Sequence, residues 1–257
     1  MDGMGATTVE QMRSLPVEKL IQIPPGPATY LNPNVDGHII PKDMLATYQA
    51  GEQNDVSMVM GNNTHEASQG RPPATLDTYL NSVDNCFPEE AAKQFLDIFR
   101  GGSLEQAHAS YIRSWDFLLG SWSMRNWAKL QTQTGKHPVY LYRFDQAPPL
   151  TPTLGAFHFA EVFYVYGNLD VLQIPWRAED RTLSEQMQSY WVNFAATGDF
   201  NGGGLPHWSS YKGANELEML LKAPEPHMEP VPDLDVLDKL DRIKAGQRVL
   251  PNEKRCY

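Results

Sequence analysis

The run VSMVMG at Val56–Gly61 is the stretch of this sequence that decides its fold. It is short and almost continuously apolar, with Asp55 before it and an asparagine pair directly after it. Such a run is typical of a strand that is buried on both faces, as the strands of a parallel sheet are. A second run, VYLYRF at Val139–Phe144, also favours a strand because it is rich in β-branched and aromatic residues.

Helical patterns alternate with these two strands. Apolar residues recur at a spacing of three to four in Thr8–Gln22 (interrupted by Pro16), Lys42–Gly51, Leu76–Ser82, Glu89–Phe99, Leu104–Gln133, Leu183–Thr197 and Asp233–Gln247. We interpret the many aromatic residues of Leu104–Gln133 as core packing. Val35–Pro41 and Glu218–Lys222 are expected to be short extended pieces. The alternation of helices and strands predicts an α/β fold.

Composition places the chain among globular proteins, with 257 residues, 41% of them hydrophobic and 20% charged. The 31 acidic residues outnumber the 21 Lys and Arg residues, which gives a formal net charge of −10. This balance disfavours nucleic acids and anionic membrane surfaces as partners. No stretch approaches the roughly 18 apolar residues of a membrane span. No signal peptide is visible at the start, so we expect either an intracellular protein or a true start that is missing.

Metal and cysteine motifs are weak in this sequence. His65 and Glu66 begin an HExxH pattern, but position 69 is Gln rather than His, so we expect no metal site and no cofactor. The two cysteines, Cys86 and Cys256, leave two alternatives open, which are one long-range disulfide or two free thiols.

Two loops carry residues that are suited to acid–base chemistry. Glu66 lies in GNNTHEASQG (Gly61–Gly70), directly after the first predicted strand, and His158 lies in LGAFHFAEVFYVYGNLD (Leu154–Asp170), after the second. Loops at the carboxyl ends of parallel strands converge over one edge of the sheet. An imidazole there can accept a hydroxyl proton, and a carboxylate on its other nitrogen fixes the tautomer. Taken alone, such a His is more often a packed residue and such a Glu a solvated loop charge; Glu161 is interpreted as a structural partner of the histidine loop.

Several motifs in order along the chain resemble the type-B carboxylesterases, a family of α/β-hydrolases. Gly61, Asn63 and Glu66 match the family's G-x-N-x-x-E segment, and the His158 loop matches the segment with its catalytic histidine. Further similar stretches are MRSLPVEKLI, DGHIIPKDMLATYQAGEQNDVSMVMG and YWVNFAATGDFNGGGLPHWSSY, the last with Phe200 where the family usually has proline. The resemblance implies that Glu66 and His158 are the acid and the histidine of a Ser-Glu-His triad, and that the complete enzyme acts on a small carboxylic ester.

The nucleophile that such a triad needs is not found in these 257 residues. A nucleophile elbow, G-x-S-x-G, requires glycine two residues before and two after the serine. Ser68 has only the later glycine and Ser103 only the earlier one. Gly202–Gly204 follows a predicted helix and is not interpreted as an oxyanion hole. We therefore expect the serine and the oxyanion glycines to lie before residue 1, so that residues 1–257 form a single partial domain, the C-terminal half of an α/β-hydrolase fold with an incomplete, mostly parallel sheet flanked by helices.

Three interpretations remain at this point. The chain is an ester hydrolase fragment that is inactive alone, a non-catalytic esterase-like binding or adhesion module, or a truncated gene product. Retention of both Glu66 and His158 argues against the binding module, because a binding surface needs neither an acid nor a base at these positions. The sequence carries no signal for an oligomeric state or for a compartment.

Overall fold

The computed structural model describes residues 5–21, 34–150 and 153–247 of the chain. It divides into two compact units, Met1–Met44 and Leu45–Tyr257, and each is described by itself. In the first unit, α1 (Val9–Arg13) and α2 (Val17–Ile21) lie on either side of Pro16, as the interrupted helical pattern predicted. The single partial domain over residues 1–257 stays a prediction.

The extended conformation predicted for Val35–Pro41 was wrong. Asp36 Oδ1 accepts hydrogen bonds from the backbone N–H groups of His38, Ile39 and Ile40, at 2.9, 2.8 and 2.9 Å. A short acidic side chain that satisfies three successive amides competes with strand pairing and stabilises a turn instead.

The second unit contains a sheet with the strand order β1-β2-β3-β4. The strands are β1 (Met58–Asn63), β2 (Val139–Phe144), β3 (Leu217–Leu221) and β4 (His227–Pro230). β1, β2 and β3 are mutually parallel and β4 is antiparallel to β3, so the mostly parallel sheet of a partial α/β fold is confirmed. β1 continues through both asparagines that the sequence had placed after the strand. β4 was not predicted, because HMEP has no apolar alternation.

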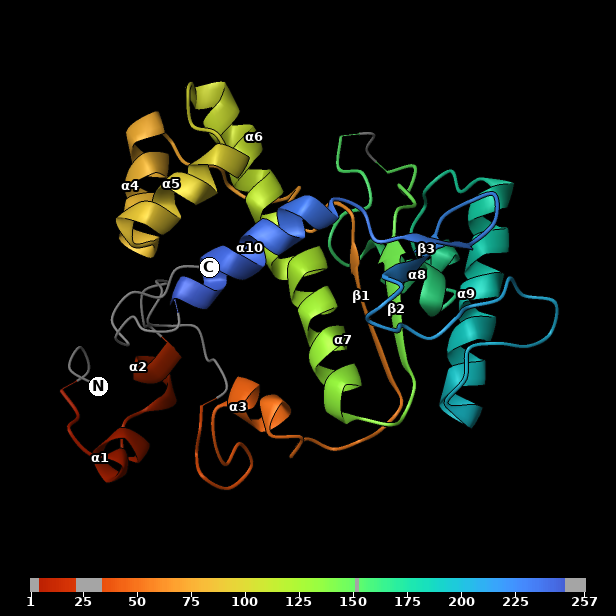
Figure 1. Ribbon diagram of the computed structural model, residues 1–257, viewed down its shortest axis with the longest axis horizontal. Coiled ribbons are helices and arrows are strands. Elements are labelled where there is room, and N and C mark those ends of the chain that lie inside the picture. The colour runs from red at the N-terminus through yellow and green to blue at the C-terminus, as the bar shows by residue number, and fades with distance from the viewer. Residues whose placement is uncertain (1–4, 22–33, 151–152, 248–257) are drawn as a thin grey trace. The chain divides into compact units, whose positions relative to one another are not determined.

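Helices cover both faces of this sheet, with α7 on one side of the strands and α9 on the other (Figure 1). The helices of the second unit are α3 (Met44–Gln49, at the boundary), α4 (Leu76–Cys86), α5 (Glu89–Ile98), α6 (Leu104–Trp115), α7 (Trp122–Thr134), α8 (Ala160–Val165), α9 (Ala178–Thr197) and α10 (Leu234–Gln247), with a π-type segment η3 (Asp116–Ser121) and a 3-10 turn η4 (Leu169–Val171). α8 and η4 were not predicted.

The pattern over Leu104–Gln133 is not one continuous helix. Gly120 has φ −98° and ψ −107°, outside the helical region, and η3 therefore forms a kink between α6 and α7. Leu118 is buried near this kink, whereas Leu119 and Trp127 are exposed, so only part of the aromatic-rich pattern packs in the core. Cys86 is buried at the end of α4 and is disulfide-bonded, so the alternative of two free thiols was wrong; Cys256 lies outside the described residues.

Alternate residues of β2 enter two different cores. Val139 and Leu141 belong to the cluster that includes residues of α4, α5, α7 and α10. Tyr140 and Phe144 belong to the cluster on the other face, with residues of α8 and α9. Since side chains alternate along a strand, this division shows that β2 is buried on both faces, as expected for a central parallel strand.

A close contact explains why the first strand carries a glycine. Gly61 pairs with Tyr142 in the parallel register, and a Cβ atom at Gly61 would lie 2.2 Å from Cδ1 of the Tyr142 ring. The ring also contacts Trp191 edge-to-face, with centroids 5.5 Å apart. Neither a ring so confined nor the strand backbone has room for a methyl group.

We expect Gly61→Ala to lower the free energy of unfolding by about 1–3 kcal/mol, the usual cost of overpacking a core. Urea denaturation followed by circular dichroism measures this change. Gly213→Ala is the matched control, because nothing lies within 4 Å of a Cβ atom at Gly213. Equal stability of the two variants would contradict the assigned contact.

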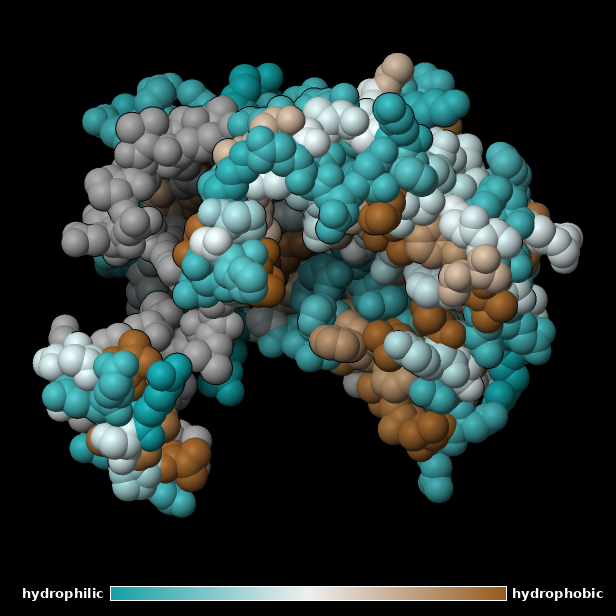
Figure 2. All heavy atoms as spheres, turned by 90° about the horizontal axis from the view of Figure 1, so that it is seen from below, coloured by the Kyte–Doolittle hydropathy of each residue, from teal (hydrophilic) through white to brown (hydrophobic). Residues whose placement is uncertain are grey.

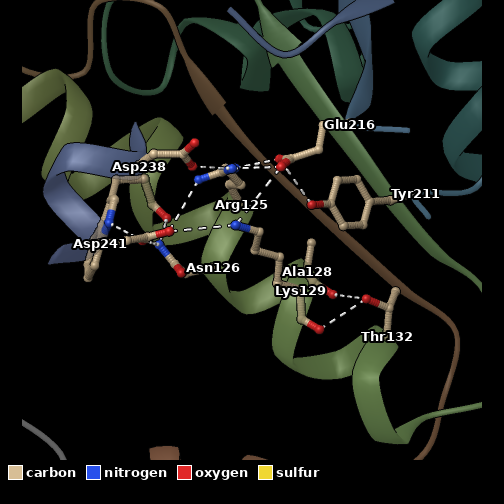
Figure 3. A network of polar contacts seen from close by, with 10 residues as sticks. Arg125, Asn126, Ala128, Lys129, Thr132, Tyr211, Glu216, Asp238 and Asp241 are labelled. Carbon is tan, nitrogen blue, oxygen red and sulfur yellow. Dashed lines mark hydrogen bonds and ion pairs between the residues drawn. The ribbon is translucent and has the colours of Figure 1, made fainter. Parts of the chain in front are cut away.

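A buried arginine joins α7 to α10 and to the turn before β3 (Figure 3). The side chain of Arg125 on α7 is only 3% exposed. Its guanidinium donates to both carboxylate oxygens of Glu216, to Asp238 Oδ1 at 2.8 Å and to Asp241 Oδ2 at 3.3 Å. Lys129 adds weaker contacts, at 3.9 Å to Glu216 and 3.5 Å to Asp241. The planar guanidinium thus holds three carboxylates from two other segments in one place.

We expect Arg125→Met to destabilise the protein by about 2–3 kcal/mol near neutral pH, since its removal leaves partly buried carboxylates without their main partner. Lys129→Met is the control and should cost less than about 1 kcal/mol.

The same network predicts a pH dependence of stability. Burial raises the pKa of Glu216, but the hydrogen bonds and charge of Arg125 outweigh this effect and lower that pKa; they also lower the pKa of Asp238. The stability gained is therefore present above the ordinary values of 4.5 and 3.8 and is lost as the pH falls below them. Denaturation at several pH values should show the gap between wild type and Arg125→Met closing in acid; a constant gap would contradict this account.

The face shown in Figure 2 carries many polar residues with patches of apolar residues between them. The exposed large apolar side chains of the second unit include Phe159, Tyr166, Val171 and Leu172. No helix in the described ranges has both the length and the apolar character that crossing a membrane requires.

Candidate active site

The carboxyl end of β1 leads directly into the Glu66 loop. Glu66 Oε1 accepts a hydrogen bond of 2.8 Å from the backbone N–H of Asn63, the last residue of the strand. The backbone N–H of Ala67, which directly follows Glu66, donates to Asp116 Oδ1 at 2.7 Å. The Glu66 side chain is only 14% exposed. The loop therefore holds this carboxylate in a defined direction.

The His158 loop follows β2 and lies against the Glu66 loop. The backbone N–H of His65 donates to the carbonyl of Ala156 at 3.1 Å, and His65 and Phe157 form a parallel bridge. The N–H of Ala156 donates back to His65 Nδ1 at 3.2 Å. Gly155 has a φ of +59°, and a Cβ atom there would lie 2.5 Å from His65 Nδ1. His65, the first residue of the incomplete HExxH pattern, thus has a structural role in joining the two loops.

The two predicted site residues meet where these loops adjoin. His158 Nδ1 lies 2.6 Å from Glu66 Oε2, within hydrogen-bond distance. Since Glu66 Oε1 is bonded to Asn63, the two oxygens of one carboxylate have separate partners. The His158 side chain is 60% exposed, and its ring packs edge-on against Phe159, with centroids 4.5 Å apart. The arrangement leaves an accessible imidazole whose Nδ1 is held by a largely buried carboxylate.

Helix α8 fixes the far end of the His158 loop. Its Tyr164 is fully buried, and the hydroxyl donates to Asp180 Oδ1 on α9 at 2.9 Å. Ser184 Oγ, also on α9, donates to the carbonyl of Tyr164 at 2.8 Å. Phe159, which precedes α8, has a φ of +74°. This left-handed conformation, uncommon for a bulky residue, is kept because the loop before it and the helix after it are both anchored.

Asn63 and Glu161 form a second polar connection between the loops. Asn63 Nδ2 donates to the carbonyl of Phe157 at 2.7 Å and to Glu161 Oε2. Burial raises the pKa of Glu161, and the hydrogen bond from Asn63 acts in the opposite direction. Glu161 is thus hydrogen bonded within the joined loops, in keeping with the interpretation of it as a structural partner. Burial, followed by the charges of Glu161 and Glu66, also raises the pKa of Tyr142 beneath them.

The residues that the sequence had set aside lie in structural positions. Ser103 caps α6, where its hydroxyl accepts a hydrogen bond of 3.2 Å from Gln106 N. Ser68 lies in the Glu66 loop, where its amide donates to the carbonyl of His65 at 3.2 Å, but its buried hydroxyl has no hydrogen-bond partner among the described residues. Gly202–Gly204 forms the loop after α9, with positive φ at all three positions. Within the described residues, no cluster of three His, Cys, Asp or Glu side chains suits a metal ion.

A cavity of about 330 Å³ lies beside the Glu66 loop. Its walls include Thr64, His65, Arg113, Asp116, Arg143 and Asp233. Sequence reasoning missed Asp116, which no motif marked. A larger cavity, of about 590 Å³, is lined by Gly135–Val139 and Ser210–Ala214 at the start of β2, which is the opposite end of that strand from the joined loops.

Parallel strands with helices on both faces, and an acid and a histidine on loops at one sheet edge, define the α/β-hydrolase class. A solved structure of a PNB esterase superimposes with a TM-score of 0.71 at 23% identity, over 91% of this chain and 49% of that one. The profile of the Carboxylesterase family matches residues 3–233, and the chain belongs to that family.

Curated relatives include two named ester hydrolases. The chain is 26% identical to bile salt-activated lipase of Rattus norvegicus over 214 residues, which cover 71% of this chain and 34% of that protein. It is 25% identical to para-nitrobenzyl esterase of Bacillus subtilis (strain 168) over 242 residues, 90% of this chain and 46% of that protein. The chain therefore spans less than half the length of these relatives.

Proposed function

We propose that this chain supplies the acid and the histidine of a serine carboxylic ester hydrolase. The observation that carries the proposal is the 2.6 Å contact between His158 Nδ1 and Glu66 Oε2 on loops that leave adjacent parallel strands. Membership of the carboxylesterase family and the names of the relatives support an ester as substrate.

The roles follow from the groups and their surroundings. With its Nδ1–H donated to Glu66, a neutral His158 carries its free lone pair on Nε2. That nitrogen accepts the proton of an attacking serine hydroxyl and later returns it to the leaving alcohol. Glu66 keeps the required tautomer and stabilises the imidazolium that forms, and its bond to Asn63 keeps the carboxylate in place while the charge changes.

The serine in this proposal comes from polypeptide outside the 257 residues, because none of them forms a G-x-S-x-G elbow. β1 is the edge strand of the described sheet, and β2 is its neighbour on one side. A further parallel strand paired with β1 would place the loop at its own carboxyl end next to the Glu66 loop. That geometry favours a nucleophile delivered across the edge of β1.

A non-catalytic binding or adhesion module is the alternative, and the contact between the two side chains disfavours it. A binding surface would not require a carboxylate that is held by the backbone and aimed at an exposed imidazole. The third interpretation, a truncated gene product, concerns the origin of the chain rather than its chemistry and is compatible with the proposed roles.

The chain alone should not hydrolyse esters appreciably. Purified 1–257, mixed with an activated short-chain ester such as a para-nitrophenyl ester, should show no burst of product, since the nucleophile and the oxyanion donors supply most of the rate. Stopped-flow absorbance measures the burst. A stoichiometric burst that His158→Ala abolishes would instead require an unrecognised nucleophile within the chain.

The roles of Glu66 and His158 can be tested in a fused enzyme. Residues 1–257 would replace the matching part of para-nitrobenzyl esterase from Bacillus subtilis (strain 168), so that the unmatched part of that protein remains. We expect His158→Ala to lower kcat by at least about 10³-fold and Glu66→Gln to lower it by a comparable or smaller factor. His227→Ala, on a side chain that is 58% exposed, is the control and should leave kcat unchanged. An active fusion in which His158→Ala has no effect would overturn the proposal.

A further inference from the structure

The Asp116 carboxylate accepts a hydrogen bond from the backbone of the Glu66 loop. It is the first residue of η3, the π-type segment between α6 and α7. Its Oδ1 accepts the hydrogen bond of 2.7 Å from the amide of Ala67, which is 49 positions away in sequence and directly follows Glu66. Ala67 is itself buried. One carboxylate therefore fixes the backbone immediately after the proposed catalytic acid.

A second contact holds η3 against β1, so the position of Asp116 is built into the fold. At the other end of the segment, Gly120 lies so close to β1 that a Cβ atom there would be 2.9 Å from Asn62 Nδ2. The kink at Gly120 makes this approach possible. Here the segment brings a carboxylate to the Glu66 loop.

Burial disfavours the ionised form of Asp116. Burial raises its pKa to about 6, while the hydrogen bond from Ala67 and the charge of His65 act against this rise and the charge of Glu66 adds to it. Arg113, Arg143 and Asp233 line the same cavity. Arg143 is bonded to Glu218 and Glu229, and Arg113 lies 4.0 Å from Asp233, so both arginines have other carboxylate partners.

We propose that Asp116 is a positioning residue for the Glu66–His158 pair, which clamps the loop after Glu66 and, when ionised, strengthens the hold of Glu66 on the imidazole. This inference rests on the proposed function and deepens it. A negative charge behind Glu66 makes its carboxylate a stronger hydrogen-bond acceptor and favours the imidazolium that forms during catalysis. A neutral side chain of the same shape would keep the clamp and lose the electrostatic effect.

The linkage between this group and stability has a definite sign. Because the pKa of Asp116 is raised in the folded protein, the folded state binds more protons than the unfolded state between the ordinary value of 3.8 and about 6. Stability therefore falls as the pH rises through this window, and the ionised form is destabilising above it. A residue kept for packing alone would gain nothing from such a charge, whereas functional sites commonly hold charges at a cost in stability.

The test uses the 1–257 chain with labelled histidine and backbone nitrogen, and it needs no ester. In the wild type, the Ala67 amide resonance should titrate with a midpoint of about pH 6, and a far-downfield resonance of the His158 Nδ1 proton should mark its bond to Glu66 at about pH 8. Asp116→Asn should abolish the pH dependence of the Ala67 amide resonance. It should keep the resonance of the His158 Nδ1 proton but move it to a less downfield position. It should also raise the Tm at about pH 8 more than at about pH 5. Asp116→Ala should lose the downfield proton through faster exchange.

Asp233→Asn is the matched control, since Asp233 lines the same cavity and asparagine tolerates its positive φ of 53°. It should leave both resonances unchanged. If the His158 Nδ1 proton of Asp116→Asn has the same chemical shift as in the wild type, the proposed effect of the Asp116 charge on the Glu66–His158 contact is overturned. If the wild-type Ala67 amide resonance does not change with pH, the proposed ionisation of Asp116 at this hydrogen bond is overturned. Should Asp116→Ala fail to fold, Asp116→Asn still decides the result. An active fused enzyme that His158→Ala leaves unchanged would refute the proposed function, and that result is independent of these resonances of the 1–257 chain.

Discussion

The parallel pairing of β1 with β2 is the constraint on which the rest of the site depends. Asn63 and Phe144, the last residues of the two strands, are partners in the register. The loops that follow the two strands therefore leave the sheet at the same end, the carboxyl end of the strands. Glu66 and His158 are 92 residues apart and meet only because of this pairing. The Tyr142 ring lies against Gly61 of the neighbouring strand, where a Cβ atom would not fit. The acid–histidine contact is therefore a consequence of strand geometry before it is a matter of the two side chains.

Much of this could be predicted from sequence, and the reason is physical. The run VSMVMG predicted a strand, and groups placed after parallel strands converge, so the neighbourhood of Glu66 and His158 follows from local patterns. The predicted burial of this run on both faces was wrong, because β1 begins at Met58, lies at the edge of the described sheet and buries only Met60 of the run. The kink at Gly120 and the contact of Asp116 with Ala67 could not be predicted, because they arise from packing between distant segments. The turn at Asp36 was missed for the opposite reason: side-chain bonds to the backbone overrode an apolar pattern.

The charged groups around the site divide into two kinds. Arg125 lies away from the joined loops, and its hydrogen bonds and charge lower the pKa of Asp238 and, against the opposing effect of burial, that of Glu216, so that network stabilises the fold near neutral pH. Around Glu66, by contrast, burial raises the pKa of both Asp116 and Glu161. The charged forms of Glu216 and Asp238 are thus stabilised, whereas burial disfavours the charged forms of Asp116 and Glu161 beside Glu66. The division is not uniform over the molecule, since the pKa of Asp145, directly after β2, is lowered and that of Glu218 on β3 is raised. Carboxylates whose charge is disfavoured by burial are nevertheless common at functional sites.

Glu66 and His158 differ in how firmly the described residues hold their side chains. Glu66 is 14% exposed and bonded to the backbone of its own loop, which is in turn clamped, whereas the His158 ring is 60% exposed. In water the attraction between a carboxylate and an imidazolium is weak, and it strengthens as solvent is excluded. A polypeptide that covers His158 would therefore strengthen the same contact that catalysis uses. By linkage, a stronger contact in the covered state would also favour association, so assembly and activation of the site would be driven by one interaction.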